Sequence, residues 1–399
     1  LINKIFNKKN NKIESLPPTQ GEKLLNEFTR GGIIKDFERE INNGLNIVKL
    51  DSLYGKKLGT EKYIYNLPLT SKLSENQTIL LAKQFFASLG TELSDKANLV
   101  LSGEDSKFKF IFEKYGQSLD RNGNSREAEV SNFSEVYCPI RGDLRDLYNI
   151  IHEVTHTFDL SNGDTEARKI FGEIAPQCME RILDEYLLNL SDGDIQKYGL
   201  DRNILIQDIR NRQVSTFLSR KDNIKSFNNG TGNKELDLRY ILAQIYSSEY
   251  MKLDNKTRTS ELLELMKSIG SNDSISCSKA FGIDLKNKLK MQFIMSDIVK
   301  NIKNTNNQIL LQEKLQEILE KSRKEKNFKV SIGNQNVHIN LESKIPFILI
   351  TPSHLENGQT LVMESNNLET NNKELLLKQA LDTGRELNDI LNGSNPILI

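Results

Sequence analysis

The sequence predicts a mainly α protein that has a small β element and a C-terminal α/β segment. Apolar residues recur at helical spacing through most of 143–325, which is typical of amphipathic helices. Polar and apolar residues alternate at 107–113, as in a half-buried strand, and strand-like and helix-like runs alternate near the C-terminal end. We therefore expect an N-terminal helical region with a polar leader at 1–85, a main domain at 86–327 and an α/β segment, complete or not, at 328–399.

Composition and charge limit the classes of protein to which this chain can belong. Of its 399 residues, 37% are hydrophobic and 27% are charged, and 54 basic side chains balance 54 acidic ones, so we expect no nucleic-acid partner. No apolar run approaches the roughly 20 residues of a membrane-spanning helix, and the start of the chain lacks the apolar stretch of a signal peptide. The cysteines Cys138, Cys178 and Cys277 are far apart, which is typical of a reducing compartment. We expect a cytoplasmic protein with no membrane span.

Caps, apolar spacing and turn residues indicate the elements along the chain. A capped amphipathic helix should run from Ser74 to Gly90. Short strands are then expected at 107–113 and 134–140, and helices at 144–159, 164–190, 235–253 and 285–324. Further on we expect a hairpin at 328–342, strand-like runs at 345–352 and 360–367, a helix at 372–393 and the start of a strand at 396–399. This last alternation resembles the opening half of an α/β-hydrolase fold, although no GxSxG nucleophile motif occurs in it.

Two of the four histidines, His152 and His156, lie four residues apart within the expected helix 144–159, whose N-cap is Asp143. Residues four apart lie on one face of a helix, so both imidazoles can bind one metal ion. Glu153 lies beside them, where its carboxylate can take a proton from a water molecule activated by the metal. This HExxH spacing predicts one zinc ion bound by His152 and His156, with Glu153 as the general base.

A catalytic zinc site needs a third protein ligand from elsewhere in the chain. The metzincin spacing is excluded, because Asp159 and Asn162 stand where that pattern requires Gly and His. A gluzincin takes a glutamate from a second helix, and Glu166, Glu173 and Glu180 are spaced seven residues apart in the next expected helix. Glu173 is favoured, because a short turn brings the two helices back antiparallel and leaves Glu173 level with the histidines. Glu180 and Asp159 remain alternatives.

The second helix carries Phe171, Glu173, Gln177 and Glu180 in the stretch "FGEIAPQCME". Together with "HEVTH", this spacing resembles the thimet-oligopeptidase-type zinc metallopeptidases, and the resemblance covers about a third of the chain. It implies that Glu173 is the third metal ligand and that Glu180 supports the site. The chain departs from the family pattern at Pro176, which lies one place later than the family's proline and is expected to kink the helix.

The same resemblance implies groups downstream that stabilise negative charge on the scissile carbonyl. That family has a Gly-rich loop, a histidine and a tyrosine cluster there, whereas this chain has a loop at 227–234, Tyr240 and Tyr246, but no histidine. Tyr240 and Tyr246 are therefore the expected catalytic donors, with Arg239 as an alternative. Their helical spacing also fits two core tyrosines.

These features predict a gluzincin-type zinc metallopeptidase, an endopeptidase or oligopeptidase that hydrolyses peptide bonds in a peptide or protein substrate. Two alternatives stay open. One is a toxin-like protease with a single protein substrate, and the other is a catalytically inactive zincin-fold protein that binds peptides or partners. An oligopeptidase is expected to cleave many short peptides. The inactive protein is expected to bind zinc without hydrolysing any peptide.

Overall fold

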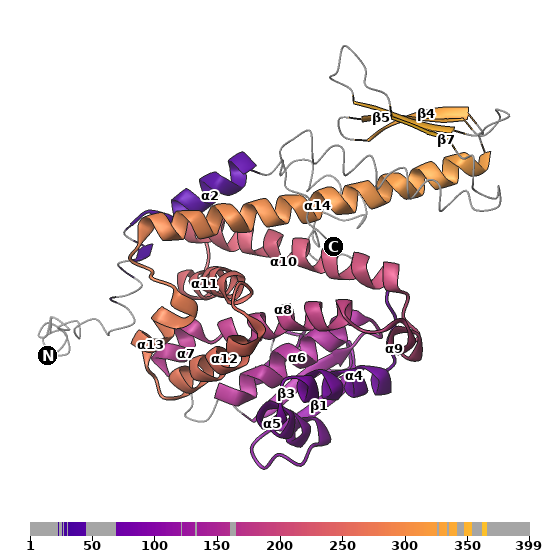
Figure 1. The fold of residues 1–399 in the computed structure, drawn as a ribbon. Helices are drawn as coiled ribbons and strands as arrows, with labels where there is room; N and C mark the ends of the chain where they lie inside the picture. Colours follow the sequence, from indigo (N-terminus) through magenta and orange to yellow (C-terminus); the bar gives the residue numbers. More distant parts are fainter. Residues whose placement is uncertain are drawn as a thin grey trace, which may run out of the picture. The chain divides into compact units, whose positions relative to one another are not determined.

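The structure is a computed structural model of the chain, drawn in Figure 1. It describes residues 23, 26, 28, 29, 31–44, 69–120, 122–131, 134–159, 165–324, 327–332, 335–340, 347–352 and 361–364. The chain divides into two compact units, Leu1–Lys303 and Asn304–Ile399, and the division falls within helix α14 (Lys288–Lys324). The domain boundaries expected after residues 85 and 327 stay predictions.

The first unit is mainly helical, as the sequence predicts. Its helices are α2 (Ile33–Gly44), α4 (Glu75–Ser88), α5 (Thr91–Ser102), α6 (Leu144–Asp159), α7 (Glu166–Phe171), α8 (Ile174–Leu188), α9 (Asp192–Lys197), α10 (Arg202–Asn229), α11 (Lys234–Tyr250), α12 (Asn255–Gly270), α13 (Ser274–Lys279), the short 3-10 helix η4 (Ala280–Gly282) and the first part of α14. The helix expected after Ser74 is confirmed as α4, because Ser74 and Gln77 form a capping box at its start. The helix expected at 144–159 is confirmed as α6.

Three short strands form the β element of the first unit. They are β1 (Lys109–Lys114), β2 (Glu129–Ser131) and β3 (Glu135–Ile140), and their order in the sheet is β1-β3-β2. β1 runs parallel to β3, and β2 runs antiparallel to it. β1 and β3 confirm the two expected strands, whereas β2 has only three residues, too few to show an alternating pattern in the sequence.

Helix α6 packs against both β3 and α8, and α8 packs in turn against α11 (Figure 1). The side chains that α6 turns toward these neighbours have no exposed surface, and they are Leu144, Leu147, Ile150, Ile151 and Val154. This is the apolar stripe of an amphipathic helix. Because the stripe is fully buried, α6 cannot rotate about its axis without opening the core, so the direction in which its polar residues project is fixed.

The second expected helix is broken, which corrects the prediction of one helix kinked at Pro176. α7 ends at Phe171 and α8 begins at Ile174, so Pro176 occupies the first turn of α8, where its missing N–H is not needed. A Cβ at Gly172 would lie 2.5 Å from the carbonyl oxygen of Arg168, so the turn between the two helices requires glycine. The N-cap of α7 is Thr165, whose side chain accepts a hydrogen bond from the N–H of Arg168.

The described strands of the second unit form an antiparallel sheet. They are β4 (Asn327–Ile332), β5 (Gln335–Asn340), β6 (Phe347–Pro352) and β7 (Leu361–Glu364), and they neighbour one another in that order. β4 and β5 confirm the expected hairpin, and β6 and β7 lie in the two strand-like runs. The helix expected at 372–393 and the strand expected at 396–399 lie outside the described residues, so the α/β character of this segment stays a prediction.

Candidate metal centre

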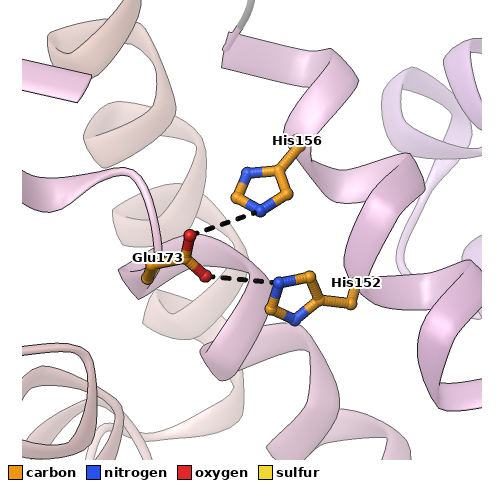
Figure 2. A group of neighbouring side chains, drawn as sticks. All are labelled: His152, His156 and Glu173. Atoms are coloured by element: carbon orange, nitrogen blue, oxygen red, sulfur yellow. Dashed lines mark ion pairs between the residues drawn. The ribbon is translucent and has the colours of Figure 1, made fainter. Parts of the chain in front are cut away.

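His152 and His156 project from the same side of α6, one helical turn apart (Figure 2). Their ring centroids are 4.9 Å apart. The expected N-cap of α6 is observed, because the Asp143 carboxylate accepts a hydrogen bond of 3.0 Å from the N–H of Arg145. The local sequence alone therefore brings two imidazoles together.

Glu173 reaches both histidines from the start of α8, where it is the N-cap residue (Figure 2). Its Oε2 lies 3.3 Å from Nε2 of His152, and its Oε1 lies 3.8 Å from Nε2 of His156. In the described part of the chain these three side chains form a group that could hold a metal ion, with ligand atoms within 4.8 Å of one another. We call His152, His156 and Glu173 the metal-binding group.

The donor set and its spacing fit a zinc ion. Two imidazole nitrogens and one carboxylate oxygen are the protein ligands of one well-known type of catalytic zinc site. With zinc–ligand bonds of about 2.0–2.2 Å, neighbouring ligand atoms of a tetrahedral site are about 3.3–3.6 Å apart. The separations of 3.3 Å and 3.8 Å, which run to different oxygens of Glu173, are close to that spacing, and all the ligand atoms lie within 4.8 Å of one another. Oε2 of Glu173 is buried and has no hydrogen-bond partner among the described residues, a deficit that a bound cation would remove.

Burial and mutual charge set the protonation of the metal-binding group. Burial lowers the pKa of His156 to about 3, so its imidazole is neutral and can donate a lone pair to a metal. Burial also acts to lower the pKa of His152, but the carboxylates of Glu173 and Glu180 outweigh it and hold that pKa well above its usual value. Burial acts to raise the pKa of Glu173, yet His156 and His152 hold it below its usual range. In the metal-free protein a proton on His152 therefore supplies the positive charge that a metal ion would supply.

A chain of hydrogen bonds fixes His152 from behind. Nδ1 of His152 lies 2.7 Å from Oε1 of Glu180, which orients the ring so that Nε2 faces Glu173. Nη1 of Arg212 donates to Oε2 of Glu180 at 2.8 Å. Nη2 of Arg212 donates to both oxygens of Asp184 at 2.9 and 3.0 Å, and the Tyr148 hydroxyl donates to Asp184 at 2.6 Å. Glu180 thus lies where the resemblance implies a supporting residue.

Sequence reasoning missed Arg212 and Asp184. Arg212 lies in α10, 32 residues after Glu180, among several other arginines of a polar helix. Nothing in the spacing of α10 distinguishes the arginine that faces α8 from the others. The only available signal was the pair Glu180 and Asp184, four residues apart, because two acids on one face of a largely buried helix need a cation opposite them.

Glu153 lies next to the metal-binding group and is only 7% exposed. Burial raises its pKa to about 7, and the carboxylates of Glu173 and of Glu129 in β2 act in the same direction, against the charge of His152. Its carboxylate makes no hydrogen bond to the described residues. A carboxyl group with no bonding partner and a pKa near neutrality suits proton transfer.

Tyr240, Arg239 and Arg220 border the metal-binding group from α10 and α11. Nη1 of Arg239 lies 3.7 Å from Oε1 of Glu173, and its Nε donates to the carbonyl of Lys169 at 2.8 Å. The guanidinium of Arg220 lies over the Tyr240 ring, 4.3 Å from its centroid. Burial raises the pKa of Tyr240, and the charge of Glu173 adds to this effect, so the hydroxyl keeps its proton. The structure therefore brings Arg239 close to Glu173 and places Tyr240 within electrostatic range of Glu173 and His152.

Tyr246 lies in the core instead. It has no exposed surface, and its hydroxyl donates to the carbonyl of Ser278 at 2.8 Å. Its ring contacts those of Phe171 and Phe281. The structure does not bring Tyr246 to the metal-binding group, because this hydrogen bond directs its hydroxyl toward α13.

The alternative third ligands differ in position. Glu166 lies in the first turn of α7 and does not belong to the metal-binding group, and Glu180 is bonded to Nδ1 of His152. Asp159 ends α6, but its side chain lies outside the described part of the chain.

Comparisons with protein-family models, with curated proteins and with solved structures find no match to this chain. Among the described helices, none is long and apolar enough to cross a membrane. What the protein does must therefore be inferred from the site itself.

Proposed function

We propose that the chain is a zinc-dependent peptidase, an endopeptidase or oligopeptidase that hydrolyses peptide bonds with Glu153 as general base. One observation carries the proposal. The side chains of His152, His156 and Glu173 converge from two helices so that their ligand atoms lie within 4.8 Å of one another, and the carboxylate of Glu153, only 7% exposed, lies beside them without a hydrogen bond to the described residues.

Each residue has a role that follows from its position. His152, His156 and Glu173 would hold the zinc ion, which would act as a Lewis acid and make a water molecule more acidic. Glu153 takes the proton of that water as the peptide carbonyl is attacked, and then delivers it to the leaving amine. The hydroxyl of Tyr240 donates a hydrogen bond to the negative charge that develops on the carbonyl oxygen.

A reducing compartment such as the cytoplasm is the proposed location. Cys138, Cys178 and Cys277 are all buried and free of disulfide bonds. Buried free thiols are usual in reducing compartments, whereas secreted domains tend to pair them.

The Glu153→Gln substitution tests the proposal. Gln keeps the size of the side chain but cannot accept a proton, so turnover of a fluorogenic peptide library should fall by about 10²-fold or more. Zinc content, measured by metal analysis, should stay at the parental level. Glu264→Gln, an exposed position in α12, is the matched control and should leave both quantities unchanged. Full turnover by Glu153→Gln, or a purified protein that takes up no zinc, contradicts the proposed function.

A further inference from the structure

Two arginines of α10 lie near the metal-binding group, and they differ in their ion pairs. Arg212 has carboxylate partners for both terminal nitrogens, at 2.8 Å from Glu180 and 2.9 Å from Asp184. Arg220, eight residues further along the helix, forms no ion pair with the described residues. Its one hydrogen bond, from Nη1 to Oδ1 of Asn223, is 3.4 Å long.

The unpaired state of Arg220 is costly within the protein alone. Its Nε, like that of Arg212, is buried and has no hydrogen-bond partner among the described residues, but Arg220 also lacks the carboxylates that Arg212 has at its terminal nitrogens. Burial lowers the pKa of Arg220, while Tyr240, Glu180 and Glu173 act electrostatically in the opposite direction without reaching ion-pair distance. A guanidinium stays protonated in proteins, so a positive charge remains whose Nε is buried and whose donors are mostly unused. Such a charge is stabilised when an anion binds to it.

The surroundings place this charge beside the reaction site. Tyr240 lies against Arg220 and is within electrostatic range of both His152 and Glu173. Arg239, the residue before Tyr240, lies 3.7 Å from Glu173 and its side chain is 27% exposed. Arg220 and Tyr240 are themselves only partly buried. A substrate group bound at Arg220 would therefore belong to the same molecule that reaches the metal-binding group.

We propose that Arg220, with Arg239 and Tyr240 beside it, binds a carboxylate of the peptide substrate close to the scissile bond. A guanidinium presents its N–H donors in a planar fork that matches a carboxylate, and Arg220 has most of these donors unused. The carboxylate is either the free C-terminus of the peptide or an acidic side chain. This inference rests on the proposed peptidase function and adds the substrate class, namely peptides with a negative charge near the bond that is cleaved.

Peptide binding to the full chain tests the inference without relying on turnover. Glu153→Gln, loaded with zinc, serves as the parent, and isothermal titration calorimetry measures two matched pairs of peptides. The first pair is Ala-Ala-Phe-Ala with a free C-terminus and with a C-terminal amide. The second pair is Ala-Phe-Glu-Ala and Ala-Phe-Gln-Ala, both amidated. The two pairs distinguish a terminal carboxylate from an acidic side chain.

In at least one pair, the charged peptide should bind about 10- to 100-fold more tightly than its neutral counterpart, as expected for hydrogen bonds to a charged group. Adding Arg220→Met should abolish this ratio, and Arg220→Lys should restore part of it, because a point charge replaces the fork. Arg202→Met is the matched control, since this arginine lies on the same helix 18 residues away, about 27 Å at the rise of an α-helix, and should leave the ratio unchanged.

Several outcomes overturn the inference. Equal binding of the charged and neutral peptides in both pairs contradicts the inference. This comparison needs no substitution at Arg220, so it remains valid if an Arg220 variant does not fold. A ratio that persists in Arg220→Met overturns it as well, and so does the absence of binding by all four peptides. A protein with Glu153 intact that hydrolyses no peptide, while the binding ratio and its loss in Arg220→Met are as expected, contradicts the proposed function alone.

Discussion

The two sides of the metal-binding group differ in how their polar groups are bonded. The first, which we call the paired side, consists of side chains that bond to one another, namely Glu180, Arg212, Asp184 and Tyr148. The second, the open side, consists of side chains that form no ion pair and, apart from the 3.4 Å hydrogen bond from Arg220 to Asn223, no side-chain hydrogen bond among the described residues, namely Glu153, Arg220 and Tyr240. Both sides are largely buried and both carry charge, so burial alone does not separate them.

The difference indicates that the paired side orients a metal ligand and the open side contacts substrate. A buried charge that already has its partners is held in one position, which suits a group that orients a metal ligand. A buried charge without partners lowers stability unless a ligand completes it, which suits a group that meets substrate. Substitutions on the paired side should therefore change stability and metal binding, whereas those on the open side should change turnover and substrate binding.

The largest effect on stability is expected from Arg212→Met. It leaves Glu180 and Asp184 buried without their cation, so the free energy of unfolding should fall by about 3–5 kcal/mol. Arg220→Met, eight residues away on the same helix, removes a charge that has no ion pair and should cost less than about 1 kcal/mol. Urea unfolding followed by circular dichroism measures both. Equal losses in the two variants would erase the distinction between the sides.

The next largest effect concerns zinc affinity. Glu180→Ala removes only the hydrogen bond that supports His152 and should lower zinc affinity by about 10- to 100-fold. Glu173→Ala removes a direct ligand and should therefore lower zinc affinity by more than about 100-fold. Zinc retained against a graded chelator gives both values, and Glu166→Ala, outside the metal-binding group, is the control. The gluzincin assignment has to be dropped if Glu173→Ala keeps its metal while Glu180→Ala or Asp159→Ala loses it.

A smaller effect separates the two tyrosines. Tyr240→Phe removes a hydroxyl on the open side and should lower kcat by about 10-fold or more, the value of one hydrogen bond to a developing charge, with little change in stability. Tyr246→Phe removes the hydrogen bond to the Ser278 carbonyl and should lower the free energy of unfolding by about 1 kcal/mol with kcat unchanged. If the two variants exchanged these effects, Tyr240 would have no role in the reaction.

The smallest effect is expected at the C-terminal end. The metal-binding group and both of its sides lie between residues 148 and 240 of the first unit. A chain that ends at Asn327 should stay folded and bind zinc with the affinity of the full chain. Metal analysis and circular dichroism of the shortened protein check this, and loss of zinc would show that 328–399 contributes to the site.

The amino-acid sequence is sufficient to predict the part of the site that lies within one helix. The bounds of α6, its cap at Asp143 and the common direction of His152 and His156 follow from local rules, because a helix repeats every 3.6 residues and a side chain can cap only the N–H groups next to it. The position of Glu173 was also expected, yet for an incomplete reason. The sequence indicated a continuous second helix, whereas the break at Gly172 makes Glu173 an N-cap residue.

The distant groups that complete the site could not be predicted from sequence spacing, because packing between helices selects them. Tyr240 and Tyr246 have the same side chain on the same helix, and packing alone places the first within electrostatic range of the metal-binding group and the second in the core. Arg212 and Arg220 share α10, and only the placement of α8 gives the first its carboxylates and leaves the second unpaired. Sequence spacing fixes neighbours along one helix, whereas contacts between helices depend on their depth and crossing angle, which the whole core sets.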